Sequence, residues 1–234
     1  MDPKKAIYLL LQELKQRTDL GDLANFYPDE GPFRRELYPK HVAMLHAGAE
    51  HSERAAMGGN RVGKTVGIGG YETALHLTGL YPPWWEGHRF DRKILAWACG
   101  TKSSKVRDVN QRKLIGGLKR IATTTLGMGA LIPRRCIGRI TRKSGVTDAV
   151  DQVVIKHRLG FDNLLTFKSY EEGRTAFEAE AVDWIWLDEE PTKPIYDECK
   201  ARLLTTRGLI LSTLTPVEGM TEAVMGLLEG TTFL

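Results

Sequence analysis

The sequence has only three cysteines and no long hydrophobic run. The first feature argues against disulfide-linked and zinc-binding proteins, and the second against membrane-spanning proteins. The three cysteines, Cys99, Cys136 and Cys199, lie tens of residues apart, and neither they nor the six histidines have the spacing of a metal site. A disulfide framework is also excluded, so we expect a reducing, cytosolic environment. The apolar run at residues 7–11 is too short to span a membrane and, unlike a signal peptide, leads directly into charged residues. We expect no membrane partner.

Charge is distributed unevenly along the chain. Its 234 residues are 42% hydrophobic and 26% charged, which fits one globular domain, and the net charge of +4 says little by itself. Residues 89–143, however, hold fifteen Lys or Arg and two acids, whereas residues 178–198 hold eight acids and one Lys. The basic stretch fits either a solvated face or a surface that binds a polyanion, and its composition leaves both interpretations open.

The pattern of apolar residues predicts alternating strands and helices. Strands are predicted at residues 54–57, 94–99, 184–187 and 209–213, with a hairpin at 153–155 and 164–167 around Gly160. Helices are predicted at residues 64–77, 195–204 and 221–228, with a polar helix through Val106, Val109 and Leu114. This alternation predicts an α/β fold, in which helices flank both faces of a mainly parallel sheet.

The first residues of the chain are predicted to form a separate region. Asp2 and Pro3 are suited to be the N-cap and the first residue of a short amphipathic helix. Residues 19–39 hold too many Gly and Pro for a regular element. We therefore expect residues 1–37 to be an N-terminal helix with a linker or wrapping arm, and residues 38–234 to be one domain.

The strongest signal is a glycine-rich loop between a predicted strand and a predicted helix. The segment GGNRVGKT satisfies the pattern GxxxxGK[ST] and consists of Gly58, Gly59, Asn60, Arg61, Val62, Gly63, Lys64 and Thr65. In such a loop, backbone N–H groups at the positive end of a helix bind phosphates, the Lys reaches the β- and γ-phosphates, and the Thr ligates Mg²⁺. The pattern predicts a P-loop that binds ATP and Mg²⁺, and a plain glycine turn is the alternative.

Two carboxylates follow another predicted strand, in VDWIWLDEEP. We assign Asp188 to the Mg²⁺ and Glu189 to catalysis, where it polarises the attacking water. An acidic cap on a loop is the alternative, which the P-loop upstream disfavours. A Glu directly after the metal-binding Asp is typical of the branch of P-loop ATPases that includes RecA-like motors.

The next predicted strand ends in LSTLTP, residues 211–216. In helicase-like motors this place holds a Ser or Thr that senses the γ-phosphate and relays its loss. Thr213 and Thr215 are the candidates here, and a turn rich in hydroxyl groups is the alternative.

Taken together, these segments resemble one protein family. LYPKH before the loop, then GGNRVGKT, VRDVNQRKLIGG, VDWIWLDEEP and STLTPVEGMTE, in this order and spacing, are similar to the large terminase subunits of tailed bacteriophages. The resemblance implies a RecA-like P-loop NTPase core that hydrolyses ATP to move double-stranded DNA into a procapsid, in the host cytoplasm. The partners it implies are double-stranded DNA, a small terminase subunit, and further copies of the chain in a ring on the portal.

The resemblance also implies further site residues. Arg61 is expected to contact phosphate, and Tyr38 and Pro39 to flank the adenine base. Where related sequences carry a Gln that reads the adenine edge, this chain has His41, whose imidazole offers one donor and one acceptor. Residues 213–216 correspond to the coupling motif. Large terminases continue into an RNase H-like nuclease, which we expect to be absent from these residues.

A ring motor usually completes its active site with an arginine from the neighbouring subunit. Arg174, in YEEGRTAF, is our candidate for this catalytic role, followed by Arg202 and Arg207. A surface Arg paired with Glu171 or Glu172 is the alternative. Two other functions stay open. One is a helicase- or RecA-like remodelling ATPase, although a helicase needs two such cores, and the other is a nucleotide-binding module without hydrolysis, which the complete set of catalytic residues disfavours.

Overall fold

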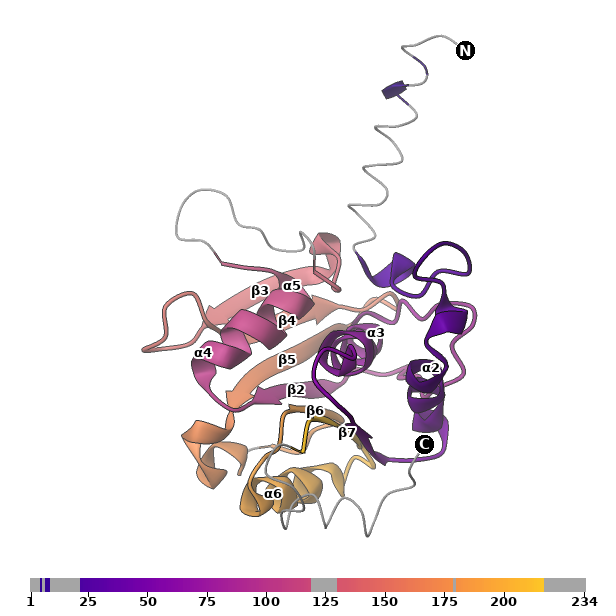
Figure 1. Ribbon diagram of the computed structural model, residues 1–234. Helices are drawn as coiled ribbons and strands as arrows, with labels where there is room; N and C mark the ends of the chain where they lie inside the picture. Colours follow the sequence, from indigo (N-terminus) through magenta and orange to yellow (C-terminus); the bar gives the residue numbers. More distant parts are fainter. Residues whose placement is uncertain (1–4, 6, 9–21, 119–129, 179, 217–234) are drawn as a thin grey trace.

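The sheet of this protein has seven strands in the part of the chain that the structure describes (Figure 1). The structure is a computed structural model that describes residues 5, 7–8, 22–118, 130–178 and 180–216. The strands are β1 (Glu53–Met57), β2 (Leu95–Gly100), β3 (Ile137–Arg142), β4 (Val150–Lys156), β5 (Asp162–Ser169), β6 (Trp184–Asp188) and β7 (Leu209–Leu214). They lie in the order β1-β7-β6-β2-β5-β4-β3, and neighbours from β1 to β5 are parallel, whereas β4 is antiparallel to β5 and β3. The predicted α/β fold with a mainly parallel sheet is confirmed.

Helices cover both faces of this sheet (Figure 1). One face carries α2 (Pro39–His46), α3 (Tyr71–Thr78), α4 (Ser103–Val106) and α5 (Arg112–Ile115), and the other carries α6 (Lys193–Leu203). Two π-helical segments extend them: η4 (Lys64–Gly70) precedes α3, and η5 (Arg107–Gln111) joins α4 to α5. The short 3₁₀ segments are η1 (Asp22–Asn25), η2 (Arg35–Leu37), η3 (Ala47–Ala49), η6 (Arg134–Cys136), η7 (Tyr170–Glu172) and η8 (Arg174–Phe177).

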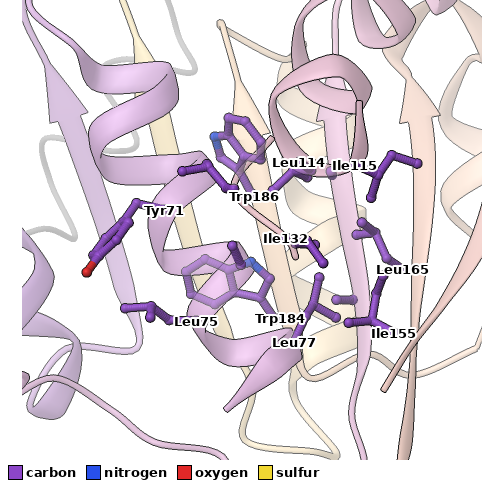
Figure 2. Packing of buried hydrophobic residues seen from close by; sticks show 14 of the residues in the cluster. Tyr71, Leu75, Leu77, Leu114, Ile115, Ile132, Ile155, Leu165, Trp184 and Trp186 are labelled. Atoms are coloured by element: carbon purple, nitrogen blue, oxygen red, sulfur yellow. The ribbon is translucent and has the colours of Figure 1, made fainter. Parts of the chain in front are cut away.

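Strand β6 contributes to two cores, one on each face of the sheet. Trp184 and Trp186 pack on the side of α3, whereas Ile185 and Leu187 pack on the side of α6, because side chains alternate along a strand. Figure 2 shows the first core, in which both indoles lie among aliphatic side chains of the helices and neighbouring strands. The buried indole of Trp184 donates from Nε1 to Oγ1 of Thr73 at 2.9 Å. A strand buried on both faces explains the continuous apolar run in the sequence.

The helix after the glycine-rich loop lies close against β6 because it carries glycine there. A Cβ atom at Gly69 would collide with the indole of Trp186. Only a residue without a side chain lets the two backbones approach this closely. The contact fixes the start of the helix beside the carboxyl end of β6.

Two elements were not predicted from the sequence, and some predictions lie outside the described residues. Helix α2 directly follows the Gly- and Pro-rich segment, and edge strand β3 exposes three of its six residues, so neither has a strong apolar pattern.

The helix predicted at residues 221–228 and most of the N-terminal helix lie outside the described residues. In the expected arm, Leu23 and Tyr27 are buried in the core on the α3 side. No helix among the described residues is long and apolar enough to cross a membrane.

Candidate active site

The glycine-rich loop joins the end of β1 to the start of η4. Two of its residues lie in the left-handed region of backbone torsions, Arg61 with φ 64° and Gly63 with φ 87°. A residue other than glycine is uncommon there and is held by its surroundings. At Gly63 a Cβ atom would also lie 2.9 Å from Cε1 of His41, so the close approach of the imidazole requires glycine.

The Lys64 side chain folds back into this loop. Its Nζ donates to the carbonyl oxygens of Gly58 (2.7 Å) and Gly59 (2.6 Å) and to Oγ1 of Thr215 (3.1 Å). The residue is 9% exposed, so the ammonium group is largely removed from water. All three of these hydrogen-bond partners are neutral dipoles, which solvate a cation without neutralising it.

Asp188 lies at the end of β6 and meets two hydroxyl groups from other elements. Its Oδ1 accepts from Oγ1 of Thr65 and from Oγ1 of Thr213, both at 2.9 Å. Thr213 in turn accepts from Nε1 of Trp186 at 2.8 Å, which orients its hydroxyl. Burial raises the pKa of Asp188 to about 6, while the two hydroxyl hydrogen bonds act in the opposite direction. The structure thus brings together three predicted site residues from distant parts of the chain.

Glu189 begins a sharp turn directly after β6. Its φ of 64° places it in the left-handed region, and its N–H donates to the carbonyl of Thr213 at 2.9 Å. The hydroxyl of Tyr170 lies 3.2 Å from the carbonyl oxygens of both Asp188 and Glu189. Tyr170 was not among the predicted site residues, and no local sequence pattern marks it, because the contact depends on the order of the strands.

Thr215, the residue directly after β7, contacts the glycine-rich loop. Thr215 donates from Oγ1 to Oδ1 of Asn60 at 3.1 Å and accepts from Lys64. The segment predicted to sense the γ-phosphate therefore contacts the loop predicted to bind it. Thr213, two residues earlier, contacts Asp188 instead.

A pocket of about 850 Å³ opens beside the loop. Tyr38, His41, Arg61 and Val62 line it, together with residues of the N-terminal arm such as Phe33. Pro39 occupies the first turn of α2, shortly before His41. Tyr38, His41, Arg61 and Val62, all predicted to bind the nucleotide, therefore lie around one cavity.

Both ring nitrogens of His41 have partners within the protein. Nε2 lies 2.9 Å from the carbonyl oxygen of Val62, and Nδ1 lies 2.7 Å from the hydroxyl of Tyr27, which itself donates to the carbonyl of Gly67 at 2.8 Å. Burial lowers the pKa of His41. The imidazole therefore joins the N-terminal arm to the loop and to η4, and its predicted reading of adenine stays a prediction.

Arg174 lies at the start of η8, after Gly173. Its guanidinium contacts Glu198 on α6 at 3.1 Å and Glu178 at 3.3 Å, and its side chain is 59% exposed. The carboxylates it pairs with are therefore not Glu171 and Glu172, which were the partners considered from the sequence. Arg202 also pairs with Glu198, at 2.6 Å.

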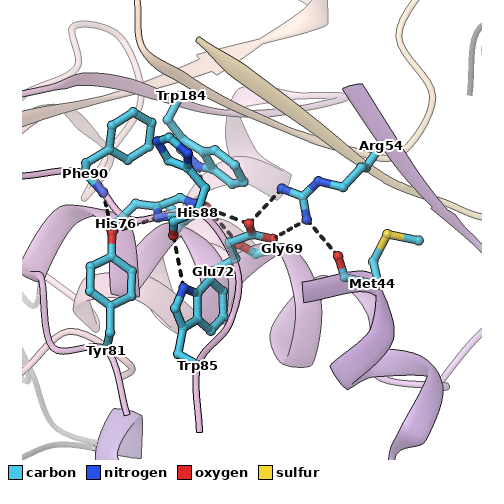
Figure 3. Close-up of polar contacts among 11 residues, drawn as sticks. Met44, Arg54, Gly69, Glu72, His76, Tyr81, Trp85, His88, Phe90 and Trp184 are labelled. Carbon is cyan, nitrogen blue, oxygen red and sulfur yellow. Dashed lines mark hydrogen bonds and ion pairs between the residues drawn. The ribbon is translucent and has the colours of Figure 1, made fainter. Parts of the chain in front are cut away.

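A second group of polar side chains, which includes a buried ion pair, lies between β1 and α3 (Figure 3). We call it the rear network, and it consists of Arg54, Glu72, His76 and Tyr81. Arg54 donates to both carboxylate oxygens of Glu72, at 2.7 and 3.0 Å, and His76 contacts the same carboxylate at 3.2 Å. Figure 3 shows the chain of hydrogen bonds continuing from His76 to Tyr81 at 3.0 Å. Arg54 is 3% exposed and Glu72 is fully buried.

The fold and the loop together define the class of this protein. A parallel sheet carries GxxxxGK[ST] between its first strand and a helix, and the strand that ends in Asp188 and Glu189 lies two positions away, which is the arrangement of a RecA-like P-loop NTPase core. Residues 55–232 match the family of the N-terminal part of the terminase large subunit, T4likevirus type. The chain belongs to this terminase large subunit family.

Individual relatives agree with this assignment. The chain is 30% identical over 209 residues to the terminase large subunit of Salmonella phage P22, an alignment that covers 82% of this chain and 41% of that protein. It therefore spans about two fifths of the length of this relative. The solved structure of a large terminase from a thermophilic bacteriophage has a similar fold, with a TM-score of 0.51 and 10% identity over 93% of this chain and 44% of that one. The predicted family and the RecA-like fold are confirmed.

Proposed function

We propose that this domain binds ATP and Mg²⁺ at the glycine-rich loop and hydrolyses the nucleotide. One observation carries the proposal: Thr65 and Asp188, 123 residues apart in the sequence, meet at 2.9 Å beside Lys64. A loop Thr and a strand-end Asp are the pair that holds Mg²⁺ in P-loop NTPases. The pocket beside the loop takes the adenine between Tyr38, Pro39 and His41.

The residues around Asp188 fit a divalent cation. The residue is 6% exposed, its carboxylate accepts from hydroxyl groups, and burial raises its pKa. Carboxylate and hydroxyl oxygens are the ligands that Mg²⁺ prefers, so Asp188 and Thr65 would hold the ion. When bound, the ion neutralises charge on the phosphate oxygens during transfer.

The other site residues act on the phosphates and on water. Lys64 exchanges the carbonyls of Gly58 and Gly59 for phosphate oxygens, and Arg61 and the loop N–H groups contact the same phosphates. Glu189 orients the attacking water and accepts its proton. Thr215 hydrogen-bonds Lys64 and Asn60, so a change at the γ-phosphate reaches the end of β7 directly.

Turnover of a variant without the catalytic carboxylate tests this proposal. Glu189→Gln should slow ATP hydrolysis about a hundredfold or more while leaving the affinity for ATP nearly unchanged, because the amide still hydrogen-bonds but no longer accepts a proton. Glu190→Gln is the matched control and should keep turnover near that of the unsubstituted protein. Wild-type turnover in Glu189→Gln would show that the catalytic assignment is wrong.

We further propose that hydrolysis drives double-stranded DNA into a viral procapsid in the host cytoplasm. Membership of the terminase large subunit family supports this role. The basic stretch offers a surface for DNA: Arg134, Arg135 and Arg139 are exposed at edge strand β3 and the segment before it. They would contact phosphates without sequence preference. Lys119 and Arg120, in the same stretch, lie outside the described residues.

The salt dependence of DNA binding tests this surface. Removing one phosphate contact should flatten the slope of log K against log salt by about 0.9, so changing the three arginines to Gln should remove up to about 2.7. Changing Lys193 and Lys200 on α6 to Gln is the control and should leave the slope unchanged. An equal slope in both variants would favour the solvated face instead.

The partners that complete such a motor are also proposals. We place several copies of the chain in a ring on the portal, together with a small terminase subunit. In this ring Arg174 reaches the nucleotide of the neighbouring copy, and its exposed position on η8 leaves it accessible to one. There it stabilises charge on the transferring phosphoryl group.

A further inference from the structure

The turn that carries Glu189 is held in an uncommon backbone conformation. A glutamate at φ 64° needs surroundings that fix it there, because the side chain disfavours the left-handed region. One such contact is made by the backbone itself, from the N–H of Glu189 to the carbonyl of Thr213. The other is made by the hydroxyl of Tyr170.

We propose that Tyr170 is a positioning residue for Glu189. Its hydroxyl lies 3.2 Å from the carbonyl oxygens of both Asp188 and Glu189 and shares its proton between them. By this contact it holds the turn that sets the direction of the Glu189 side chain. The inference rests on the proposed ATPase function, in which Glu189 activates the water.

The geometry of a strand explains why this hydroxyl selects the turn. Along an extended strand, successive carbonyl groups point to opposite sides, so one donor does not reach two in a row. The carbonyls of Asp188 and Glu189 approach the same hydroxyl because Glu189 leaves the extended conformation at the end of β6. The contact therefore favours the left-handed turn over a continued strand.

The segment that carries Tyr170 is itself firmly held. Ser169 and Glu172 form a reciprocal capping arrangement at the two ends of η7. Ser103, at the start of α4, donates from its N–H to Glu171 at 2.7 Å, and its Oγ lies 2.9 Å from Oγ of Ser169. Helix α4 and the cap of η7 thus hold the tyrosine in place. A residue on a supported element can position another side chain accurately.

Removing the hydroxyl alone tests the proposal. Tyr170→Phe should lower kcat about tenfold to a hundredfold, because small displacements of a catalytic group cost this much. The affinity for ATP should stay within about twofold, because the Tyr170 hydroxyl contacts two backbone carbonyls and neither the loop nor the Asp188 carboxylate. Tyr196→Phe is the matched control: its hydroxyl donates to Glu53, and its ring packs in the same core as Tyr170. It should keep kcat unchanged.

A double variant separates positioning from a general loss of stability. If Tyr170 acts through the Glu189 carboxylate, Tyr170→Phe combined with Glu189→Gln should turn over no more slowly than Glu189→Gln alone. A further tenfold decrease in the double variant, or an unchanged kcat in Tyr170→Phe, overturns the inference. A Glu189→Gln variant with wild-type turnover would instead overturn the proposed catalytic role itself, so the two failures are distinguishable.

Discussion

Two groups of buried charge lie along the segment formed by η4 and α3, one at the start of η4 and the other beside α3, and they are built differently. At the loop end, Lys64 and Asp188 each have neutral hydrogen-bond partners, carbonyls for the cation and hydroxyls for the anion. In the rear network, Arg54 and Glu72 neutralise each other through two hydrogen bonds. Both groups are largely buried, but only the rear network contains a direct ion pair.

The difference separates a structural role from a functional one. A buried charge with an opposite partner has its desolvation offset within the protein, and breaking such a pair is strongly destabilising. A buried charge whose hydrogen-bond partners are all neutral keeps more of its desolvation cost, and a ligand of opposite charge can offset it. We therefore expect substitutions at the loop end to change activity, and substitutions in the rear network to change stability.

The largest effect is expected at Lys64. Lys64→Ala removes a cation that acts in both nucleotide binding and the transition state, so kcat/KM should fall about a thousandfold or more. The free energy of unfolding should change by less than about 1 kcal/mol, because the hydrogen bonds that disappear are to neutral groups, and two of these, the carbonyls of Gly58 and Gly59, belong to residues that are not fully buried. Steady-state kinetics and urea unfolding measure the two quantities. A strongly destabilised Lys64→Ala protein would contradict the expectation that the loop end contributes to activity rather than to stability.

Arg174 is a test case for this distinction between structural and functional charges. It forms ion pairs with carboxylates, as a structural residue would, and yet we propose that it acts in catalysis. If it leaves Glu178 and Glu198 to contact a neighbour's nucleotide, Arg174→Ala should slow hydrolysis about a thousandfold in the assembled ring. Activity of the unsubstituted domain should also rise with protein concentration.

Mixing two inactive variants makes the Arg174 test decisive. An Arg174→Ala chain and a Glu189→Gln chain, mixed, form interfaces at which an intact arginine meets an intact glutamate, so activity should return. The control mixture pairs Arg174→Ala with the double variant Arg174→Ala/Glu189→Gln and should stay inactive. If the first mixture also stays inactive under conditions where the wild type assembles, the arginine is structural, as its ion pairs alone would indicate.

The rear network should respond in the opposite way to the loop. Glu72→Gln leaves Arg54 buried without its counter-charge and should lower the free energy of unfolding by about 3 to 5 kcal/mol. Turnover per folded molecule should change little. The double variant Arg54→Met/Glu72→Met removes both charges and should be less destabilised than the single one, because no unpaired charge is left. Equal destabilisation in both variants would contradict a role for charge pairing.

The loop end was predictable from the sequence, whereas the rear network was not. GxxxxGK[ST] is a continuous motif, and the apolar run before Asp188 marks a buried strand, so both could be placed without a structure. Arg54 looked like any charged residue in a short strand, because its partner comes from a helix eighteen residues later. The contact of Tyr170 with Glu189 likewise depends on strand order. Tyr170 follows β5 and Glu189 follows β6, and these two strands lie on either side of β2. Strand order and side-chain burial are non-local, which is why these residues were missed.

The smallest expected effect concerns the pH dependence of stability, and it arises from His76 in the rear network. Its Nε2 faces a carboxylate oxygen, which only accepts, and its Nδ1 faces the Tyr81 hydroxyl, so a neutral imidazole with its proton on Nε2 satisfies both contacts.

Burial lowers the pKa of His76 in the folded protein below its value of 6.5 in the unfolded chain. As the pH falls below about 6.5, the unfolded chain takes up a proton that the folded protein does not, so the free energy of unfolding decreases by up to about 1.4 kcal/mol per pH unit. The pKa of Glu72 is also lowered, so its contribution is lost only at more acidic pH. His76→Gln should therefore flatten the pH dependence of stability between about pH 6.5 and 5 without changing it above about pH 7.5. Urea unfolding of both proteins across this range measures the slope, and equal slopes below pH 6.5 would mean that His76 titrates alike in the folded and unfolded states.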